Sequence, residues 1–183
     1  MKNNYETTVE IPEGINCTSS GTTLNCSKGN TQLVKKFEIH TIIISVKGKE
    51  IVLTCKKANK KGVANVNAIA AHIRNLFLGL NERFVYEMEI CNVHFPMTVK
   101  TDKENFIITN FLGEKVPRNA KILSGVEVKV AGTKVTISSA DIEKAGQTAA
   151  NIEKASKVTK KDRRIFQDGI FITKKPGAEK WVS

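Results

Sequence analysis

A self-match at one fixed offset constrains this chain more than any other feature. Residues 9–53 reappear at 93–137 without a gap, an offset of 84 (132 − 48). The identical pairs are Val9/Val93, Pro12/Pro96, Gly29/Gly113, Val46/Val130 and Gly48/Gly132. Because only these five of the 45 compared positions are identical, chance similarity of composition is the alternative. Apolar positions keep the same register, which favours a duplicated β-rich unit, each copy building its own core.

Strand patterns come first in each copy. Alternating apolar residues predict strands at 8–11, 22–26, 41–46 and 50–55, and at 83–90 leading into the second copy. Gly48 and Gly132 each separate two such strands and indicate tight hairpin turns. We therefore expect two domains, residues 1–83 and 84–183.

Helical spacing of apolar residues follows the hairpin in both copies. One stripe runs from Val66 to Leu80, with Gly79 as a plausible stop, and a thinner one from Ile142 to Ile152. Ser138 and Asp141 before the second stripe resemble a capping box. The expected fold class is α+β, with each repeat a small antiparallel sheet packed against one helix, and the two helices weaken an all-β alternative.

The charge balance points to a polyanionic partner. Lysine and arginine number 29 against 18 acidic residues, a formal net charge of +11. Nucleic acid is favoured over an anionic membrane, because no basic amphipathic helix carries bulky aromatic residues. The amino terminus has no apolar signal segment, and no apolar run is long enough to span a bilayer, so we expect a soluble, cytoplasmic protein.

The sequence contains no pattern that favours catalysis, a cofactor or a metal. Its three histidines, His40, His72 and His94, are far apart, and neither a phosphate-binding glycine loop nor a nucleophile elbow is found. The cysteines show no zinc-ligand spacing, and we expect all four to be free thiols: Cys17, Cys26, Cys55 and Cys91. We predict a protein that is not an enzyme.

A basic segment near the carboxyl terminus is the sharpest functional signal. The stretch from Lys154 to Lys180 contains nine basic and three acidic residues. A solvated charged tail without a specific function is the usual interpretation of such a run. Ile165 and Phe166 among the charges, with a turn expected at Asp168-Gly169, instead predict a folded segment that presents its cations outward. No RNP-like strand, Gly-x-x-Gly clamp or helix-turn-helix pattern is found, which favours recognition of backbone and shape over base sequence.

Two blocks carry a resemblance to a known family. Residues 110–115 (NFLGEK) and 161–172 (KDRRIFQDGIFI) resemble the archaeal and eukaryotic branch of large-subunit ribosomal protein six, called protein nine in older eukaryotic naming. His94-Phe95-Pro96 supports the match. The resemblance implies two tandem α+β domains and a structural role in the large ribosomal subunit. It places the protein near the sarcin-ricin loop and the stalk base, beside other large-subunit proteins. In a eukaryote, it would pass through the nucleolus for assembly.

The resemblance also gives a set of expected rRNA-binding residues. They are Lys157, Lys160, Lys161, Arg163, Arg164, Phe166, Asp168, Gly169, Lys174, Lys175, Asn110, Gly113 and Lys115. Asp168 is expected to hold a turn rather than to touch RNA, because a carboxylate repels phosphate. A free-standing basic RNA-binding module or RNA chaperone is the alternative function that the charge alone permits.

Overall fold

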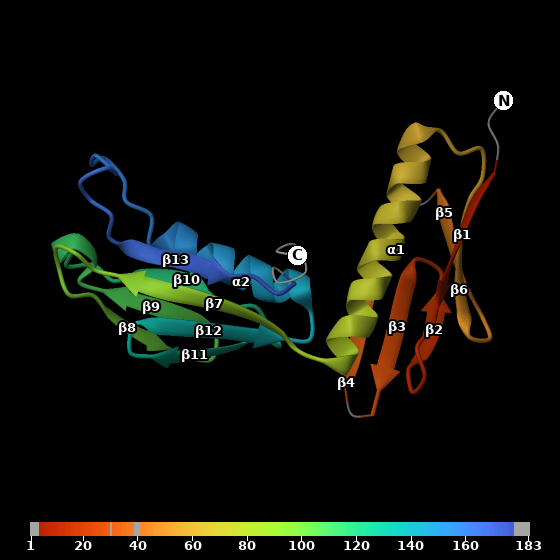
Figure 1. Ribbon diagram of the computed structural model, residues 1–183, viewed down its shortest axis with the longest axis horizontal. Coiled ribbons are helices and arrows are strands. Elements are labelled where there is room, and N and C mark those ends of the chain that lie inside the picture. The colour runs from red at the N-terminus through yellow and green to blue at the C-terminus, as the bar shows by residue number, and fades with distance from the viewer. Residues whose placement is uncertain (1–3, 30, 39–40, 178–183) are drawn as a thin grey trace. The chain divides into compact units, whose positions relative to one another are not determined.

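The computed structural model describes residues 4–29, 31–38 and 41–177. His40, Glu179 and Lys180 therefore lie outside the described residues. The chain divides into two compact units, Met1–Arg83 and Phe84–Ser183, and Figure 1 shows strands and one long helix in each. Each unit has its own cluster of buried apolar residues.

The N-terminal unit combines two three-stranded antiparallel sheets with one helix. The first sheet has the order β1 (Tyr5–Glu10), β6 (Glu50–Cys55), β5 (Ile42–Lys47). The second has the order β2 (Asn16–Ser20), β3 (Thr23–Lys28), β4 (Thr31–Lys36). Helix α1 (Lys60–Asn81) packs on both sheets.

The C-terminal unit repeats this plan and adds a strand and a 3-10 turn. Its larger sheet has the order β11 (Glu127–Ala131), β12 (Lys134–Ser139), β7 (Phe84–Cys91), β13 (Gly169–Lys174). Its smaller sheet has the order β10 (Arg118–Lys121), β9 (Asn105–Thr109), β8 (Thr98–Thr101), with η1 (Phe111–Gly113) between β9 and β10. Helix α2 (Ile142–Ala155) contacts both sheets.

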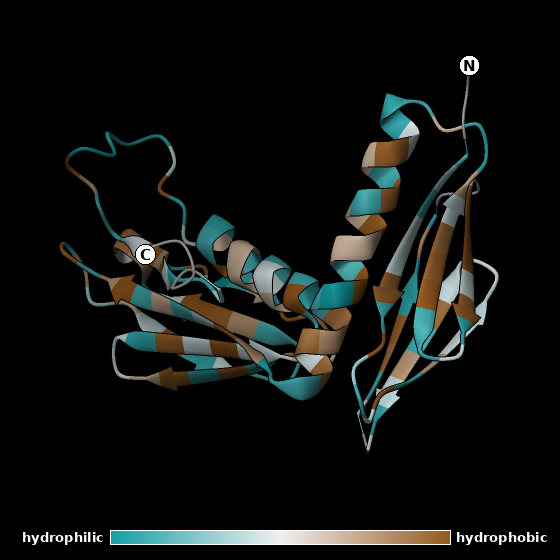
Figure 2. Cartoon of the chain, turned by 45° about the vertical axis from the view of Figure 1, so that its right-hand side comes forward, coloured by the Kyte–Doolittle hydropathy of each residue, from teal (hydrophilic) through white to brown (hydrophobic). Residues whose placement is uncertain are grey.

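The predicted α+β class is confirmed, but each unit holds two small sheets instead of one. The smaller sheets include strands of only four residues, β8 and β10, which are too short to show a clear alternating pattern. Both helices interleave hydrophobic and hydrophilic residues along their length (Figure 2), as the sequence periodicity predicts. None of the described helices combines the length and the apolar character needed to cross a membrane.

The helix ends differ in detail from the prediction. Gly79 does not stop α1: it is buried within the last turn, and the helix continues to Asn81 before Glu82 becomes extended. At the start of α2, the side chain of Asp141 accepts a hydrogen bond from the Glu143 amide. Ser139, not Ser138, supports this cap, because its hydroxyl accepts from the Asp141 amide.

The two hairpins at the centre of the repeat match in register. Val46 pairs with Ile51 across the β5–β6 hairpin, and Val130 pairs with Val135 across β11–β12. Both turns place a glycine in the left-handed region, Gly48 at φ +59° and Gly132 at φ +61°. The hairpin predictions are confirmed, and backbone geometry accounts for the shared glycines.

The fixed offset does not extend to the first strand of each unit. Val9 pairs with Ile51, whereas the partner of Val135 is Met88. Met88 therefore occupies the place of Val9, and Val93 lies exposed in the loop after β7. The predicted equivalence of Val9 and Val93 is wrong because the two units have connections of different length between this strand and the hairpin.

Two of the four cysteines do not follow the prediction of free thiols. Cys17 and Cys26 form a disulfide, with their Cα atoms 4.3 Å apart. Cys55 and Cys91 are free, as predicted. The β2–β3 register puts Cys17 directly opposite Cys26 across a turn that contains Gly21. Spacing along the sequence alone does not reveal such a cross-strand pair.

In the C-terminal unit, a cross-strand pair with the same separation of nine residues is apolar. Val99 faces Ile108 across β8–β9, and both pack in the core of that unit. Cys17 and Cys26 likewise belong to the core of the N-terminal unit. The β2–β3 hairpin is thus linked by a disulfide, whereas the β8–β9 hairpin has an apolar pair at this separation.

Truncating a side chain in one core should destabilise the protein by an amount that burial predicts. We expect Ile137→Ala, at a fully buried position of the C-terminal unit, to lower the free energy of unfolding by about 2–5 kcal/mol in denaturant titrations. The matched change Ile43→Ala, at a side chain that is 51% exposed, should cost no more than about 0.5 kcal/mol. Equal losses would contradict the core described here.

Candidate nucleic-acid interface

A loop between α2 and β13 carries most of the predicted site residues. Residues 157–168, called the basic loop below, leave α2 at Ser156 and return to the sheet at Gly169. The buried Ser156 hydroxyl accepts a hydrogen bond from the Ile170 amide at 2.9 Å and lies 3.4 Å from the Ile170 carbonyl oxygen. These contacts join the two ends of the basic loop.

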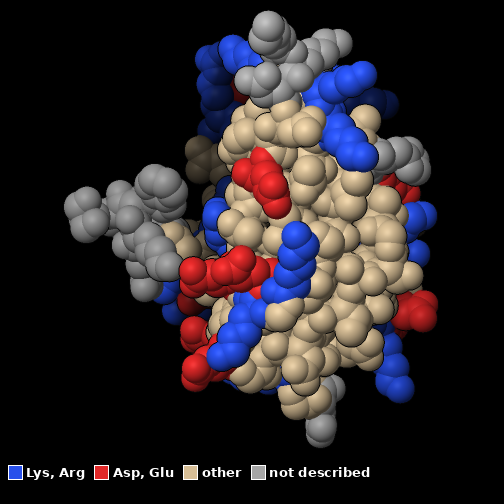
Figure 3. Space-filling model, turned by 90° about the vertical axis from the view of Figure 1, so that its right-hand side faces the viewer, with Lys and Arg blue, Asp and Glu red and all other residues tan. Residues whose placement is uncertain are grey.

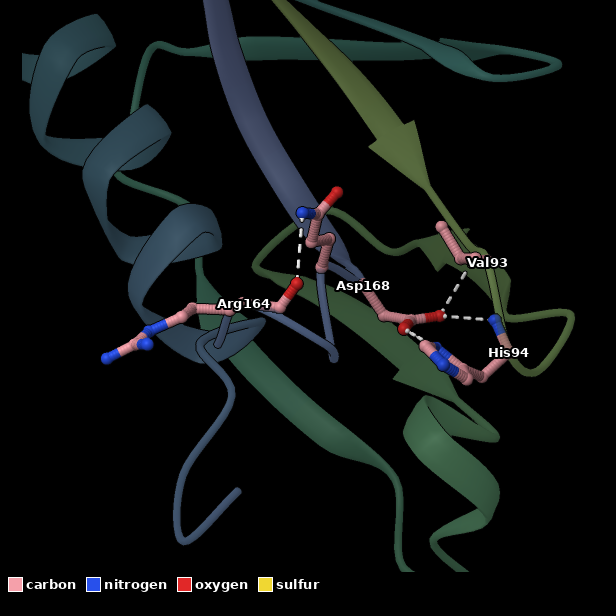
Figure 4. A network of polar contacts seen from close by, with 5 residues as sticks. Val93, His94, Arg164 and Asp168 are labelled. Carbon is pink, nitrogen blue, oxygen red and sulfur yellow. Dashed lines mark hydrogen bonds and ion pairs between the residues drawn. The ribbon is translucent and has the colours of Figure 1, made fainter. Parts of the chain in front are cut away.

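The Asp168 carboxylate anchors the basic loop from inside (Figure 4). It is 1% exposed. Its Oδ1 accepts hydrogen bonds from the Val93 amide at 2.8 Å and the His94 amide at 3.0 Å, and its Oδ2 lies 2.6 Å from His94 Nδ1. The carboxylate therefore holds the basic loop to the segment that follows β7.

These hydrogen bonds stabilise the charged form of Asp168. Burial on its own would raise the pKa of Asp168. Hydrogen bonds from the His94 amide, the His94 side chain and the Val93 amide outweigh burial, so the net effect lowers the pKa. Asp168 is therefore an anion at neutral pH, and hydrogen bonds inside the protein stabilise its charge, which is not displayed on the surface.

The turn within the basic loop lies earlier than the sequence suggested. Asp168-Gly169 makes no turn, since Gly169 already belongs to β13. Asp162 forms the turn instead: its carboxylate accepts from the Arg164 amide at 2.9 Å, and its carbonyl accepts from the Ile165 and Phe166 amides. Arg163 is exposed on this turn.

Phe166 connects the anchor to a lysine. Its half-buried ring lies against the His94 imidazole, with centroids 4.7 Å apart. The ammonium of Lys161 lies 4.4 Å from the centre of the same ring. A cation–π contact of this kind contributes roughly 0.5–1 kcal/mol at an exposed site, which favours one position of Lys161 over the many open to a free lysine.

The second predicted block forms an irregular loop beside Pro96. The Asn110 side-chain amide donates to the Pro96 carbonyl at 2.9 Å, and Asn110 has a left-handed backbone. Gly113 is also left-handed, at φ +79°, and its α-carbon faces the Phe95 ring. Lys115 follows and is exposed. The left-handed backbone conformation thus explains Gly113.

Arg118 ties the 110–115 loop to the basic loop, a role that the sequence analysis missed. Its guanidinium donates to both carboxylate oxygens of Glu114 at 2.6 and 2.7 Å, and to the Ala155 and Lys157 carbonyls at 3.0 and 2.9 Å. The hydrogen bond from Arg118, together with the charges of Arg118 and Lys161, outweighs burial and lowers the pKa of Glu114. An arginine directly after a proline, as Arg118 is after Pro117, gives no sequence signal for such a role.

The structure gathers most of the predicted residues and separates two. The exposed members of the cluster at this end of the C-terminal unit are Lys157, Lys160, Lys161, Arg163, Arg164, Asn110, Gly113 and Lys115. Phe166, Asp168 and Gly169 lie beneath them as supports. Lys174 and Lys175 lie at the far end of β13, because Gly169 pairs with Cys91 and Lys174 with Glu87.

The N-terminal unit exposes cations as well: Lys56, Lys57, Lys60 and Lys61 lie between the end of β6 and the first turn of α1. Figure 3 looks onto the N-terminal unit, where acidic and basic side chains are scattered over a mostly uncharged face. Across residues 4–29, 31–38 and 41–177, no three His, Cys, Asp or Glu side chains are grouped so as to hold a metal ion. His94 is used as a packing and hydrogen-bonding residue.

Comparison with known proteins identifies similar chains. The family model described as ribosomal protein L6 matches residues 95–169, which include both loops. The chain is 41% identical over 168 residues to the large ribosomal subunit protein uL6 of Methanosarcina mazei, covering 92% of this chain and 96% of that protein. It is 43% identical over 169 residues to the uL6 protein of Ignicoccus hospitalis, covering 90% and 91%. The identity to the Haloarcula marismortui protein is 36% over 168 residues, covering 92% and 94%.

Replacing Asp168 should remove a pH-dependent part of the stability. Folding lowers the pKa of Asp168. The stabilisation of the fold by its ionised carboxylate is therefore fully present above the unfolded pKa of about 3.9. This stabilisation is lost as the pH falls through the lower pKa of the folded state. We expect Asp168→Asn to lower the free energy of unfolding by about 1–3 kcal/mol at pH 7 in denaturant titrations. The difference in unfolding free energy between this variant and wild type should become smaller below pH 4.

Asp102→Asn is the matched control, since it removes one carboxylate at an exposed position. It should change the free energy of unfolding by less than about 0.5 kcal/mol across the same pH range. A pH profile of Asp168→Asn that runs parallel to wild type would show that the carboxylate is not anchored as described.

Proposed function

Because this chain belongs to the uL6 family of large-ribosomal-subunit proteins, we propose that it is a structural constituent of the large subunit that binds rRNA through the basic loop and the 110–115 loop. Membership confirms the family that residues 110–115 and 161–172 resemble. Because the relatives are named as ribosomal proteins, it also confirms the prediction of a role other than enzymatic catalysis.

One observation carries the proposed RNA contact. The basic loop is closed by Ser156 and anchored by the buried Asp168, and it exposes five cations: Lys157, Lys160, Lys161, Arg163 and Arg164. Ordering a flexible side chain on binding costs roughly 0.5–1.5 kcal/mol. A loop that is already fixed avoids the further cost of ordering its backbone, so its cations can contact several phosphates at once.

The location on the particle is the finer part of the proposal. Resemblance to the family suggests contact near the sarcin-ricin loop and the stalk base, next to other large-subunit proteins, in ribosomes of the cytoplasm. The compact cluster at one end of the C-terminal unit supports a local footprint on folded rRNA. Protection of the sarcin-ricin region from chemical probes when the chain is added to large-subunit RNA would test this location.

Neutralising the arginines of the turn should weaken binding without unfolding the protein. If the five cations of the basic loop and Lys115 contact phosphates, log affinity falls with log salt at a slope of roughly −4 to −5. We expect Arg163→Ala with Arg164→Ala to make this slope shallower by about 1.5–2 in filter-binding titrations with large-subunit rRNA. Thermal stability should change little, because both side chains are exposed.

A matched double variant, Lys47→Ala with Lys49→Ala, removes two exposed cations from the β5–β6 turn of the N-terminal unit. Its salt slope should equal that of wild type. Equal effects of the two double variants would place the RNA contact elsewhere. Equal affinity of wild type for unrelated RNA would favour a free-standing RNA-binding module over a ribosomal constituent.

A further inference from the structure

A groove lies between the C-terminal half of α2, the strand β13 and the basic loop. Its volume is about 830 Å³, within the roughly 300–1,000 Å³ typical of pockets for small organic ligands. Apolar parts of its lining come from Cys91, Val93, Ala150, Val158, Phe166 and Phe171. The proposed function of the basic loop as a set of phosphate contacts leaves this apolar space unexplained.

The walls of the groove provide aromatic and uncharged surface. Phe171, on the edge strand β13, is 38% exposed although it is a large apolar side chain. Phe166 enters from the basic loop. Burial, with the charges of Glu89 and Asp168, raises the pKa of the Cys91 thiol, so this wall is uncharged at neutral pH. An aromatic wall of this kind suits the flat face of a base.

The rim of the groove is positively charged. Lys154 lies in the last turn of α2, Lys157 and Arg163 lie in the basic loop, and all three are exposed. The acidic lining residues are Glu153 and Asp168, and Asp168 is occupied by its hydrogen bonds to Val93 and His94. An occupant therefore needs an apolar, flat part for the floor and negative charge for the rim.

We propose that this groove binds one unstacked nucleotide of RNA, with its base against Phe171 and its phosphates at Lys154, Lys157 and Arg163. The inference rests on the proposed function, because it takes the basic loop to lie on RNA. A nucleotide combines a flat aromatic base with anionic phosphates, and unpaired bases of folded RNA are the parts that proteins stack on aromatic side chains. A hydrophobic peptide segment would not use the three cations on the rim.

The test measures the affinity of the full chain for large-subunit RNA of the source organism in wild type and in two variants at position 171. Phe171→Leu keeps apolar bulk and removes the aromatic face. We expect it to weaken binding about 5- to 20-fold, which is less than the full loss when a stacking aromatic residue is replaced by alanine. Phe171→Trp keeps an aromatic face and should bind within about 2-fold of wild type. Thermal midpoints of all variants report whether the fold is kept.

Ile165→Ala is the matched control, because Ile165 is 62% exposed in the same loop but does not line the groove. It should leave the affinity unchanged. If wild type binds large-subunit RNA and folded Phe171→Leu binds it equally well, the nucleotide site is wrong while the proposed function stands. The same holds if Phe171→Trp weakens binding as much as Phe171→Leu. If wild type does not prefer large-subunit RNA over unrelated RNA, the proposed function itself fails.

Discussion

One buried carboxylate fixes the position of the basic loop, the segment that we propose binds RNA. Asp168 is at the end of the basic loop, and its partners, Val93 and His94, follow the first strand of the same unit, 75 and 74 residues earlier in sequence. A buried carboxylate without partners costs several kcal/mol, so the loop is stable only where both amides meet it. The position of the loop is therefore set by these internal hydrogen bonds and not by the charges that the loop displays.

Further contacts extend from this anchor to the exposed cations. His94 packs on Phe166, and Phe166 carries Lys161 over its ring. Arg118 then joins Glu114 to the backbone of Lys157, which brings the 110–115 loop to the same end of the unit. An array fixed in this way differs from a solvated tail of equal charge, because its cations have a defined spacing that matches some arrangements of phosphates and not others.

Local patterns predicted much of the fold and part of the site. Gly48 and Gly132 mark hairpins because a tight turn needs residues that accept positive φ. A short stretch of sequence is enough to recognise this requirement. The contacts of Asp168, the role of Arg118 and the Cys17–Cys26 disulfide join residues whose proximity depends on strand register or on long-range packing. The fixed offset failed between Val9 and Val93 for the same reason, since pairing follows the register of β7 with β12. The role of Asp168 as an internal anchor, and not as a turn residue, needed the three-dimensional structure.

Amide hydrogen exchange at Val93 and His94 tests the anchored loop most directly. Val93 is 69% exposed and lies in the loop after β7, so an unanchored chain would exchange both amide protons at rates close to those of an open peptide. If Asp168 accepts both hydrogen bonds, the two amides exchange slowly at neutral pH, as slowly as the Ile170 amide that Ser156 holds. Fast exchange at Val93 and His94 beside a protected Ile170 would contradict the account.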